Sequence, residues 1–114
     1  MRLVFLSYPV SDLKESIAYY RDNFGFEEAW REGELTAALK LEGTNVNLML
    51  DQEDDGGPGG VFLVDSVDAF YEAHKDRVQF VREPFDIPPG RYAMFKDNSG
   101  NPVRLIDMTK EREV

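Results

Sequence analysis

Apolar positions recur with two different periods along the chain, and the change of period marks the predicted elements. The opening run RLVFLSY is rich in β-forming residues and predicts a strand over residues 2–8. From residue 12 the apolar positions recur at spacings of three and four, which predicts an amphipathic helix over residues 12–24. The helical stripe consists of Leu13, Ile17, Tyr20 and Phe24.

Both ends of this helix carry recognisable signals. Asp12 stands at the N-cap with Glu15 three places later, which is the spacing of a capping box. Gly25 supplies the C-terminal stop. Three short apolar runs follow, separated by glycine-containing turns, and predict strands over residues 26–31, 35–41 and 46–51.

The order of elements restarts after an acidic, glycine-rich stretch. DQEDDGGPGG (residues 51–60) has no periodicity and predicts a flexible linker. A strand over 60–64 and a helix over 66–76 are predicted next, with Asp65 as the N-cap. The apolar side of this helix carries Val67, Phe70, Tyr71 and then His74. Further strands are predicted over 78–85, 91–97 and 102–108, before a charged tail, TKEREV, that is expected to fray.

Each half of the chain thus has the order βαβββ. Aligning the halves pairs Val10 with Val64, 54 residues apart, and Leu48 with Leu105, 57 residues apart. We therefore predict an α+β fold in which duplicated βαβββ modules form a curved mixed-sheet cup with the helices outside. The expected organisation is a single domain over residues 1–114, with repeat halves at roughly 1–52 and 59–109.

Composition and charge narrow the functional class. Thirteen Lys and Arg against 22 Asp and Glu give a net charge of −9, which disfavours nucleic-acid binding. The absence of cysteine excludes disulfides and thiolate metal sites. No signal sequence and no apolar run of about 20 residues is visible. A cytoplasmic protein without a membrane partner is expected.

Two stretches resemble the vicinal oxygen chelate superfamily, which includes glyoxalase I, bleomycin-resistance proteins, fosfomycin-resistance enzymes and extradiol dioxygenases. VSDLKESIAYYRDNFGF (residues 10–26) is similar to V-x-D-x-x-x-S-x-x-F-Y-x-x-x-L-G-F, and FKDNSGNPVRLID (residues 95–107) to F-x-D-P-x-G-N-x-x-E-L. With FLVDSVDAFYEA, the similarity covers nearly the whole chain. The resemblance implies one duplicated βαβββ domain per chain, and often a homodimer.

Metal-binding members of that superfamily take ligands from four sheet positions, and the resemblance places unsuitable residues there. The corresponding positions are Phe5, Asn47 or a near neighbour, Gly59 or Gly60, and Arg104. Phenylalanine and glycine offer no donor atom, and arginine repels a cation. Asparagine is a weak oxygen ligand for transition metals. The resemblance therefore implies that the metal site is absent, and we expect no metal and no cofactor.

Strand alternation predicts which side chains line the cup. Residues two apart share a face, so the former ligand positions indicate the inward face. On the strand over 91–97, either Tyr92 with Met94 or Ala93 with Phe95 faces inward. The predicted ligand-binding set is Phe5, Trp30, Asn47, Met49, Tyr92, Met94, Arg104 and Ile106, with no catalytic residue assigned.

A filled cup is the alternative to an open one. In that case the inward residues form core, and Arg104 pairs with an internal carboxylate such as Asp107 rather than with a ligand's carboxylate or phosphate. The lone histidine, His74, is expected to be a packed or surface residue, because no second histidine accompanies it.

The sequence predicts a metal-independent small-molecule binding protein of the glyoxalase/bleomycin-resistance type, sequestering a drug or metabolite. One alternative is a metal-dependent lyase or dioxygenase of the same superfamily. The other is a dimeric structural or regulatory module with a filled cup. Enzymatic activity stays open, and the expected partners are a small-molecule ligand and a second copy of the chain.

Overall fold

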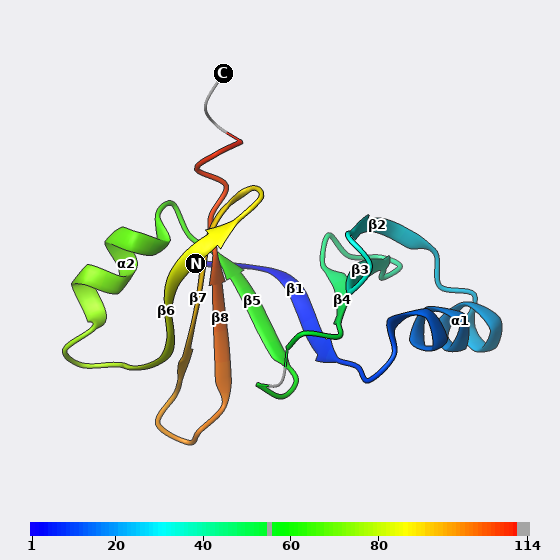
Figure 1. Cartoon of the computed structure of the whole chain (residues 1–114), viewed down its shortest axis with the longest axis horizontal. Helices are drawn as coiled ribbons and strands as arrows, with labels where there is room; N and C mark the ends of the chain where they lie inside the picture. Colours follow the sequence, from blue (N-terminus) through cyan, green and yellow to red (C-terminus); the bar gives the residue numbers. More distant parts are fainter. Residues whose placement is uncertain (55, 112–114) are drawn as a thin grey trace. The chain divides into compact units, whose positions relative to one another are not determined.

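The structure is a computed structural model that describes residues 1–54 and 56–111 (Figure 1). The chain forms two compact units. One comprises Val4–Pro58, and the other comprises Met1–Leu3 together with the chain from Gly59 onward. We call them the first and the second module. Asp55, in the predicted linker, and the last three residues of the predicted fraying tail lie outside the described residues.

The first module has the predicted order βαβββ, and its strands lie in the order β2-β3-β4-β1. β1 runs parallel to β4, whereas β2, β3 and β4 are antiparallel neighbours, so this sheet is mixed. Its elements are β1 (Arg2–Pro9), of which residues from Val4 onward belong to this module, α1 (Leu13–Phe24), β2 (Glu28–Glu32), β3 (Thr36–Lys40) and β4 (Asn47–Asp51).

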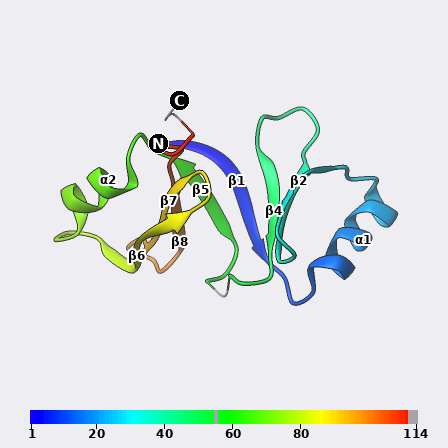
Figure 2. The same cartoon turned by 45° about the horizontal axis from the view of Figure 1, so that its top comes forward.

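The second module repeats this plan with the strand order β5-β8-β7-β6. β5 is parallel to β8, and β8, β7 and β6 are antiparallel neighbours. α2 contacts β6 and β7 and lies beside them in both views (Figures 1 and 2). Its elements are β5 (Gly59–Leu63), α2 (Val67–His74), β6 (Gln79–Ile87), β7 (Gly90–Lys96) and β8 (Pro102–Ile106). The α+β class and the duplicated βαβββ order are confirmed.

The predicted caps of α1 are confirmed, but its apolar stripe ends one turn early. Asp12 Oδ1 accepts a hydrogen bond from the Glu15 N–H at 2.9 Å, and Gly25 adopts φ 73°, the left-handed conformation that glycine tolerates. Phe24, predicted to extend the stripe, is 61% exposed. The chain turns at Gly25, and Phe26 packs on the core in its place.

The predicted N-cap of α2 is wrong by one residue. Ser66, not Asp65, is the N-cap, and its hydroxyl accepts a hydrogen bond from the Ala69 N–H at 3.1 Å. The helix begins at Val67, so a side chain at position 65 comes one residue too early for this bond. At the other end, His74 stacks on Phe70 with ring centroids 4.1 Å apart, and its Nδ1 lies 2.8 Å from the Phe70 carbonyl oxygen. It is the packed residue that we expected.

Each module buries one face of its sheet against its helix. In the first module Leu13 and Ile17 of α1 pack with Leu39, Leu48 and Leu50. In the second, Val67 of α2 packs with buried Ala93 and Leu105. Because strand side chains alternate, the residues between these core positions lie on the opposite side of each sheet, which we call the helix-distal face.

The same capping arrangement occurs in both modules and defines their correspondence. The first N–H of α1, at Leu13, donates to Gln52 Oε1 at 2.9 Å, and the first N–H of α2, at Val67, donates to Asp107 Oδ2 at 2.7 Å. Gln52 and Asp107 each follow directly after the last strand of their module. The structural counterpart of Arg104 is therefore Met49.

The sequence alignment paired the last strands two residues out of this register. A slip of two residues keeps every apolar side chain on the same face of a strand, so the hydrophobic pattern does not detect it. In the described part of the chain, no helix is long and apolar enough to cross a membrane.

Candidate functional site

The four predicted ligand-binding residues of the first module lie on its helix-distal face. Phe5 is paired with Asn47 across β1 and β4, and Ala38 of β3 lies between Trp30 and Met49 in the strand register. The rings of Phe5 and Trp30 meet edge to face, with centroids 5.6 Å apart. Phe5, Trp30 and Asn47 are half-buried, and Met49 is buried. The centre of this face is apolar, and its polar groups are Asn47 at one end, Thr36 and Asp51 at the other, and the buried Ser7 beside Met49.

The four predicted residues of the second module also share its helix-distal face. Tyr92 is opposite Ile106 and Met94 is opposite Arg104 in the β7–β8 register. On β7, Tyr92 and Met94 lie on the helix-distal face, because Ala93 lies in the α2 core with Phe95 packed against it. Met94, Arg104 and Ile106 are buried, and Tyr92 is half-buried.

Two further residues lie on this face that strand alternation in the sequence did not predict. Phe85 of β6 is opposite Tyr92, with ring centroids 5.6 Å apart, and the Arg82 guanidinium lies 4.1 Å over the Phe85 ring. The pairing of β6 with β7 shifts register on both sides of Arg82. Simple alternation along β6 therefore could not place these two residues, since a bulge reverses which residues face each way.

The Arg104 guanidinium lies beside Gly59 on the neighbouring strand β5. Arg104 is fully buried on β8. A Cβ atom at Gly59 would lie 3.2 Å from Arg104 Nη1 and 2.7 Å from the Pro102 carbonyl oxygen. The Pro102 carbonyl, on the backbone, is therefore what limits the space at position 59, whereas the Arg104 guanidinium is the end of a flexible side chain beside it.

Asp107 does not serve as the partner of Arg104. Its carboxylate is buried and accepts hydrogen bonds from the Val67 N–H at 2.7 Å and the Arg91 N–H at 2.9 Å. The Thr109 hydroxyl donates at 2.9 Å and the Thr109 N–H at 3.3 Å. Burial raises the pKa of Asp107, but these hydrogen bonds outweigh it and leave the pKa below its usual value. Asp107 is therefore an ionised structural group.

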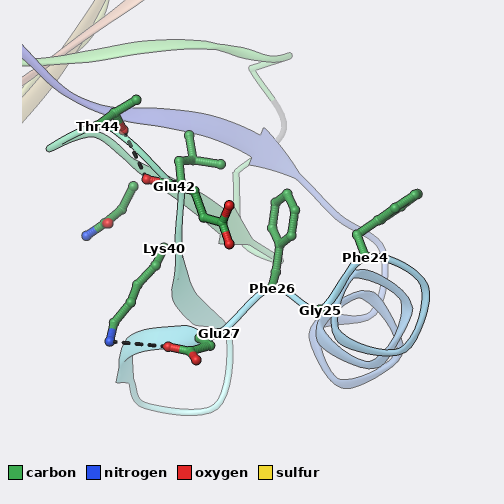
Figure 3. A pocket seen from close by; sticks show the side chains of 9 residues that line it. Phe24, Gly25, Phe26, Glu27, Lys40, Glu42 and Thr44 are labelled. Atoms are coloured by element: carbon green, nitrogen blue, oxygen red, sulfur yellow. Dashed lines mark hydrogen bonds and ion pairs between the residues drawn. The ribbon is translucent and has the colours of Figure 1, made fainter.

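A groove of about 590 Å³ lies within the first module, at one end of its sheet. It borders the C-terminal end of α1, the residues just before β2, and the turn between β3 and β4 (Figure 3). No pattern in the sequence indicated this groove, although Asn47 belongs both to the groove and to the helix-distal face. Its lining residues are Phe24, Gly25, Phe26, Glu27, Lys40, Leu41, Glu42, Thr44 and Asn47.

The groove combines aromatic walls with charged side chains. Phe26 and Leu41 are half-buried and pack against the module core. Lys40 Nζ lies 3.6 Å from Glu27 Oε2. Figure 3 shows the Glu42 carboxylate projecting between the Phe26 ring and the Lys40 side chain. The arrangement offers apolar contact and one carboxylate outside that ion pair.

A family model decides the relationship of this chain to known proteins. The model of the Glyoxalase/Bleomycin resistance protein/Dioxygenase superfamily matches residues 2–105. The chain belongs to this superfamily. The predicted resemblance is thereby confirmed over nearly the whole sequence, and the two βαβββ modules are the architecture expected of it. No curated protein matches the chain.

Solved structures share the fold of this superfamily member at low sequence identity. A protein of Legionella pneumophila described as NAD-dependent benzaldehyde dehydrogenase matches with TM-score 0.72 and 16% identity, over 91% of this chain and 97% of that one. A superfamily member from Vibrio splendidus 12B01 matches with TM-score 0.62 and 19% identity, over 93% and 97%. Methylmalonyl-CoA epimerase of Streptomyces coelicolor, solved with 2-nitronate-propionyl-CoA, matches with TM-score 0.69 and 23% identity, over 94% of each chain.

The residues of this superfamily member do not fit a metal ion at the four aligned positions. In the second module Arg104 brings a permanent positive charge, and Gly59 has no side chain to offer a donor atom. In the first, Phe5 has no donor atom, and neither Asn47 nor Met49, the counterpart of Arg104, is a strong ligand for a divalent cation. Residues 1–54 and 56–111 contain no group of three or more His, Asp and Glu side chains placed to hold a metal.

Proposed function

We propose that this protein binds small organic molecules without a metal ion. The observation that carries the proposal is that Phe5, Gly59 and a fully buried Arg104 stand at positions where the resemblance implies metal ligands. A buried guanidinium in place of a carboxylate reverses the local charge. Chemistry that depends on a Lewis-acidic metal at these positions lacks its ligands, whereas ligand binding does not need them.

The helix-distal face of the first module supports binding of an apolar molecule. Phe5 and Trp30 present an edge-to-face pair, and Asn47 adds a polar group that can orient a ligand. An apolar surface with few polar groups is the usual composition of small-molecule sites. On the second module, Tyr92, Met94 and Ile106 are the proposed counterparts. Sequestration of a drug or metabolite is the role that such binding would serve.

Metal content separates this proposal from the metal-dependent lyase or dioxygenase. Protein purified without chelators and without a histidine tag is analysed for zinc, nickel, iron and manganese by elemental analysis. The proposal expects far less than one ion per chain. One bound ion per chain, retained on dialysis, would contradict it and redirect the work to enzyme assays on glutathione adducts and catechols.

Ligand binding separates the proposal from a structural module with filled faces. Trp30 is the only tryptophan and touches Phe5, so its fluorescence reports on this face. A screen of drug-like and metabolite compounds should find molecules that change Trp30 emission saturably. For each hit, Asn47→Ala should weaken binding, whereas Asn98→Ala, at an exposed position, should not. A screen without saturable hits would contradict the proposal.

The homodimer and the cytoplasmic location belong to the same proposal. Relatives implied by the resemblance often pair two chains, and a chain of 114 residues buries a modest fraction of its surface alone. Analytical ultracentrifugation over a hundredfold concentration range tests this, with a mass of twice 13.1 kDa as the expected result.

A further inference from the structure

The groove at the end of α1 adjoins an exposed aromatic cluster. Tyr19, Tyr20, Phe24 and Phe26 contact one another, with ring centroids 5.5–6.4 Å apart. Tyr19 is 58% exposed, and Phe24 is exposed to a similar extent. Phe24 and Phe26 belong to both the cluster and the groove. Large exposed aromatic residues that gather beside a cavity are typical of a binding surface rather than of a free exterior.

The charges around this groove favour a single positive group. Glu27 is paired with Lys40, so these two charges offset each other. Glu42 forms no ion pair with any residue that the structure describes, and its carboxylate points toward the Phe26 ring (Figure 3). The C-terminal end of a helix carries partial negative charge, and Gly25 at the end of α1 lines the groove. An anion would meet unfavourable charge here.

A carboxylate beside an aromatic face is the chemistry that recognises an organic ammonium ion. The carboxylate attracts the charge, and the ring face adds a cation–π contact. A divalent metal fits less well, because the other carboxylate of the groove, Glu27, is already paired with Lys40. The Thr44 hydroxyl is bonded within its own turn, 2.9 Å from the Val46 carbonyl oxygen. The apolar walls then suit the body of the same molecule.

We infer that this groove binds an organic cation with an aromatic or alkyl body, its ammonium group at Glu42 and Phe26 and its body against Phe24 and Leu41. The inference rests on the proposed function and names a ligand class for the first module. It is independent of whether the helix-distal face is also occupied.

The experiment titrates the full-length, ¹⁵N-labelled protein with benzyltrimethylammonium and follows the amide signals by NMR. Phenylacetate and benzyl alcohol, an anion and a neutral molecule of similar ring size, serve as comparison probes. The inference expects benzyltrimethylammonium to shift the amides of Gly25, Phe26 and Glu42 saturably and the other two probes to bind more weakly.

Variants test the two contacts separately. Because exposed ion pairs and cation–π contacts are individually modest, Glu42→Gln should weaken the affinity about fivefold. Phe24→Leu should weaken it about two- to threefold through lost ring contact. Glu34→Gln removes the same charge at an exposed position outside the groove and should leave the affinity unchanged.

Each of three results of the titration would overturn the inference: no saturable shift, equal binding of phenylacetate, or shifts confined to Phe5 and Trp30. Equal weakening by Glu42→Gln and Glu34→Gln would reduce the effect to net charge and also overturn it. None of these results changes the outcome expected from the metal analysis or from the Trp30 fluorescence screen, which test the proposed function. The ligand class of the groove and the proposed function can therefore fail separately.

Discussion

Replacing Asp107 by asparagine should destabilise the second module strongly. The carboxylate connects three segments, because it accepts hydrogen bonds from the N–H groups of Val67 at the start of α2, Arg91 in β7 and Thr109 after β8. Asparagine keeps one oxygen and turns an N–H₂ donor toward a group that is itself a donor. Either the Val67 amide or the Arg91 and Thr109 groups then lose their acceptor.

The size of this loss follows from the burial of the site. A buried N–H without an acceptor costs about 1–3 kcal/mol, and hydrogen bonds to a charged group contribute about 1.5–3 kcal/mol. These terms overlap, so the free energy of unfolding should fall by about 3 kcal/mol, a large part of the ~5–15 kcal/mol of a typical domain. Asp76→Asn changes an exposed carboxylate on the same module and should stay within about 0.5 kcal/mol.

The pH dependence gives the same residue a second signature. The folded-state pKa of Asp107 is lowered, so its ionised form stabilises the fold above the unfolded-state pKa of about 4 and this contribution is lost as the pH falls further. The stability difference between wild type and Asp107→Asn should therefore shrink below pH 4.

Urea unfolding followed by far-UV circular dichroism at pH 7 and pH 3 measures this difference, and amide exchange at Val67 and Arg91 localises it. Circular dichroism is needed because Trp30 reports only on the first module. A loss below about 1 kcal/mol with unchanged exchange would refute the role of Asp107 as a buried three-way acceptor.

Other changes test the packing and capping around these sites by the same unfolding measurement. Gly90→Ala should cost about 1–3 kcal/mol, because its Cβ would overlap the Asp107 side chain and carbonyl. In Gly33→Ala the new Cβ meets nothing within 4 Å, so only the left-handed backbone conformation should destabilise the fold, by about 1 kcal/mol. Equal losses of stability in the two variants would contradict the overlap proposed at Gly90. Ser7→Ala should raise stability by about 1 kcal/mol, since the buried Ser7 hydroxyl has no hydrogen-bond partner among the described residues; a loss would show an unrecognised bond. Gln52→Ala should cost about 1 kcal/mol by freeing the Leu13 N–H, with faster exchange of that amide as the check.

Local patterns in the sequence predicted the elements well because their causes are local. The N-cap at Asp12 and the glycine stop at Gly25 are formed by residues a few positions apart, and both occur as predicted. That Ser66 rather than Asp65 is the N-cap of α2 also has a local cause. It depends on the residue at which the helix begins, and the hydrophobic pattern predicts that residue only to within one or two positions.

The candidate site was less predictable because its causes are not local. The helix-distal position of Tyr92 and Met94 depends on which face of β7 packs on α2. The two bulges of β6 hid Arg82 and Phe85. The groove depends on α1 ending beside the β3–β4 turn, a contact between segments about 15 residues apart that no motif records.

The proposed absence of a metal site rests on several positions, so a single substitution would not supply a complete set of ligands. A donor side chain at position 59 alone would bring its Cβ to 2.7 Å from the Pro102 carbonyl oxygen, which only a shift of the backbone could relieve. Restoring an acidic residue at position 104 alone would leave a buried carboxylate facing a glycine, without a metal ligand opposite to share its charge. In the first module Phe5 and Trp30 already fill the corresponding side with packed rings. Under the proposed function, creating a metal site here would therefore require substitutions at several of these positions together.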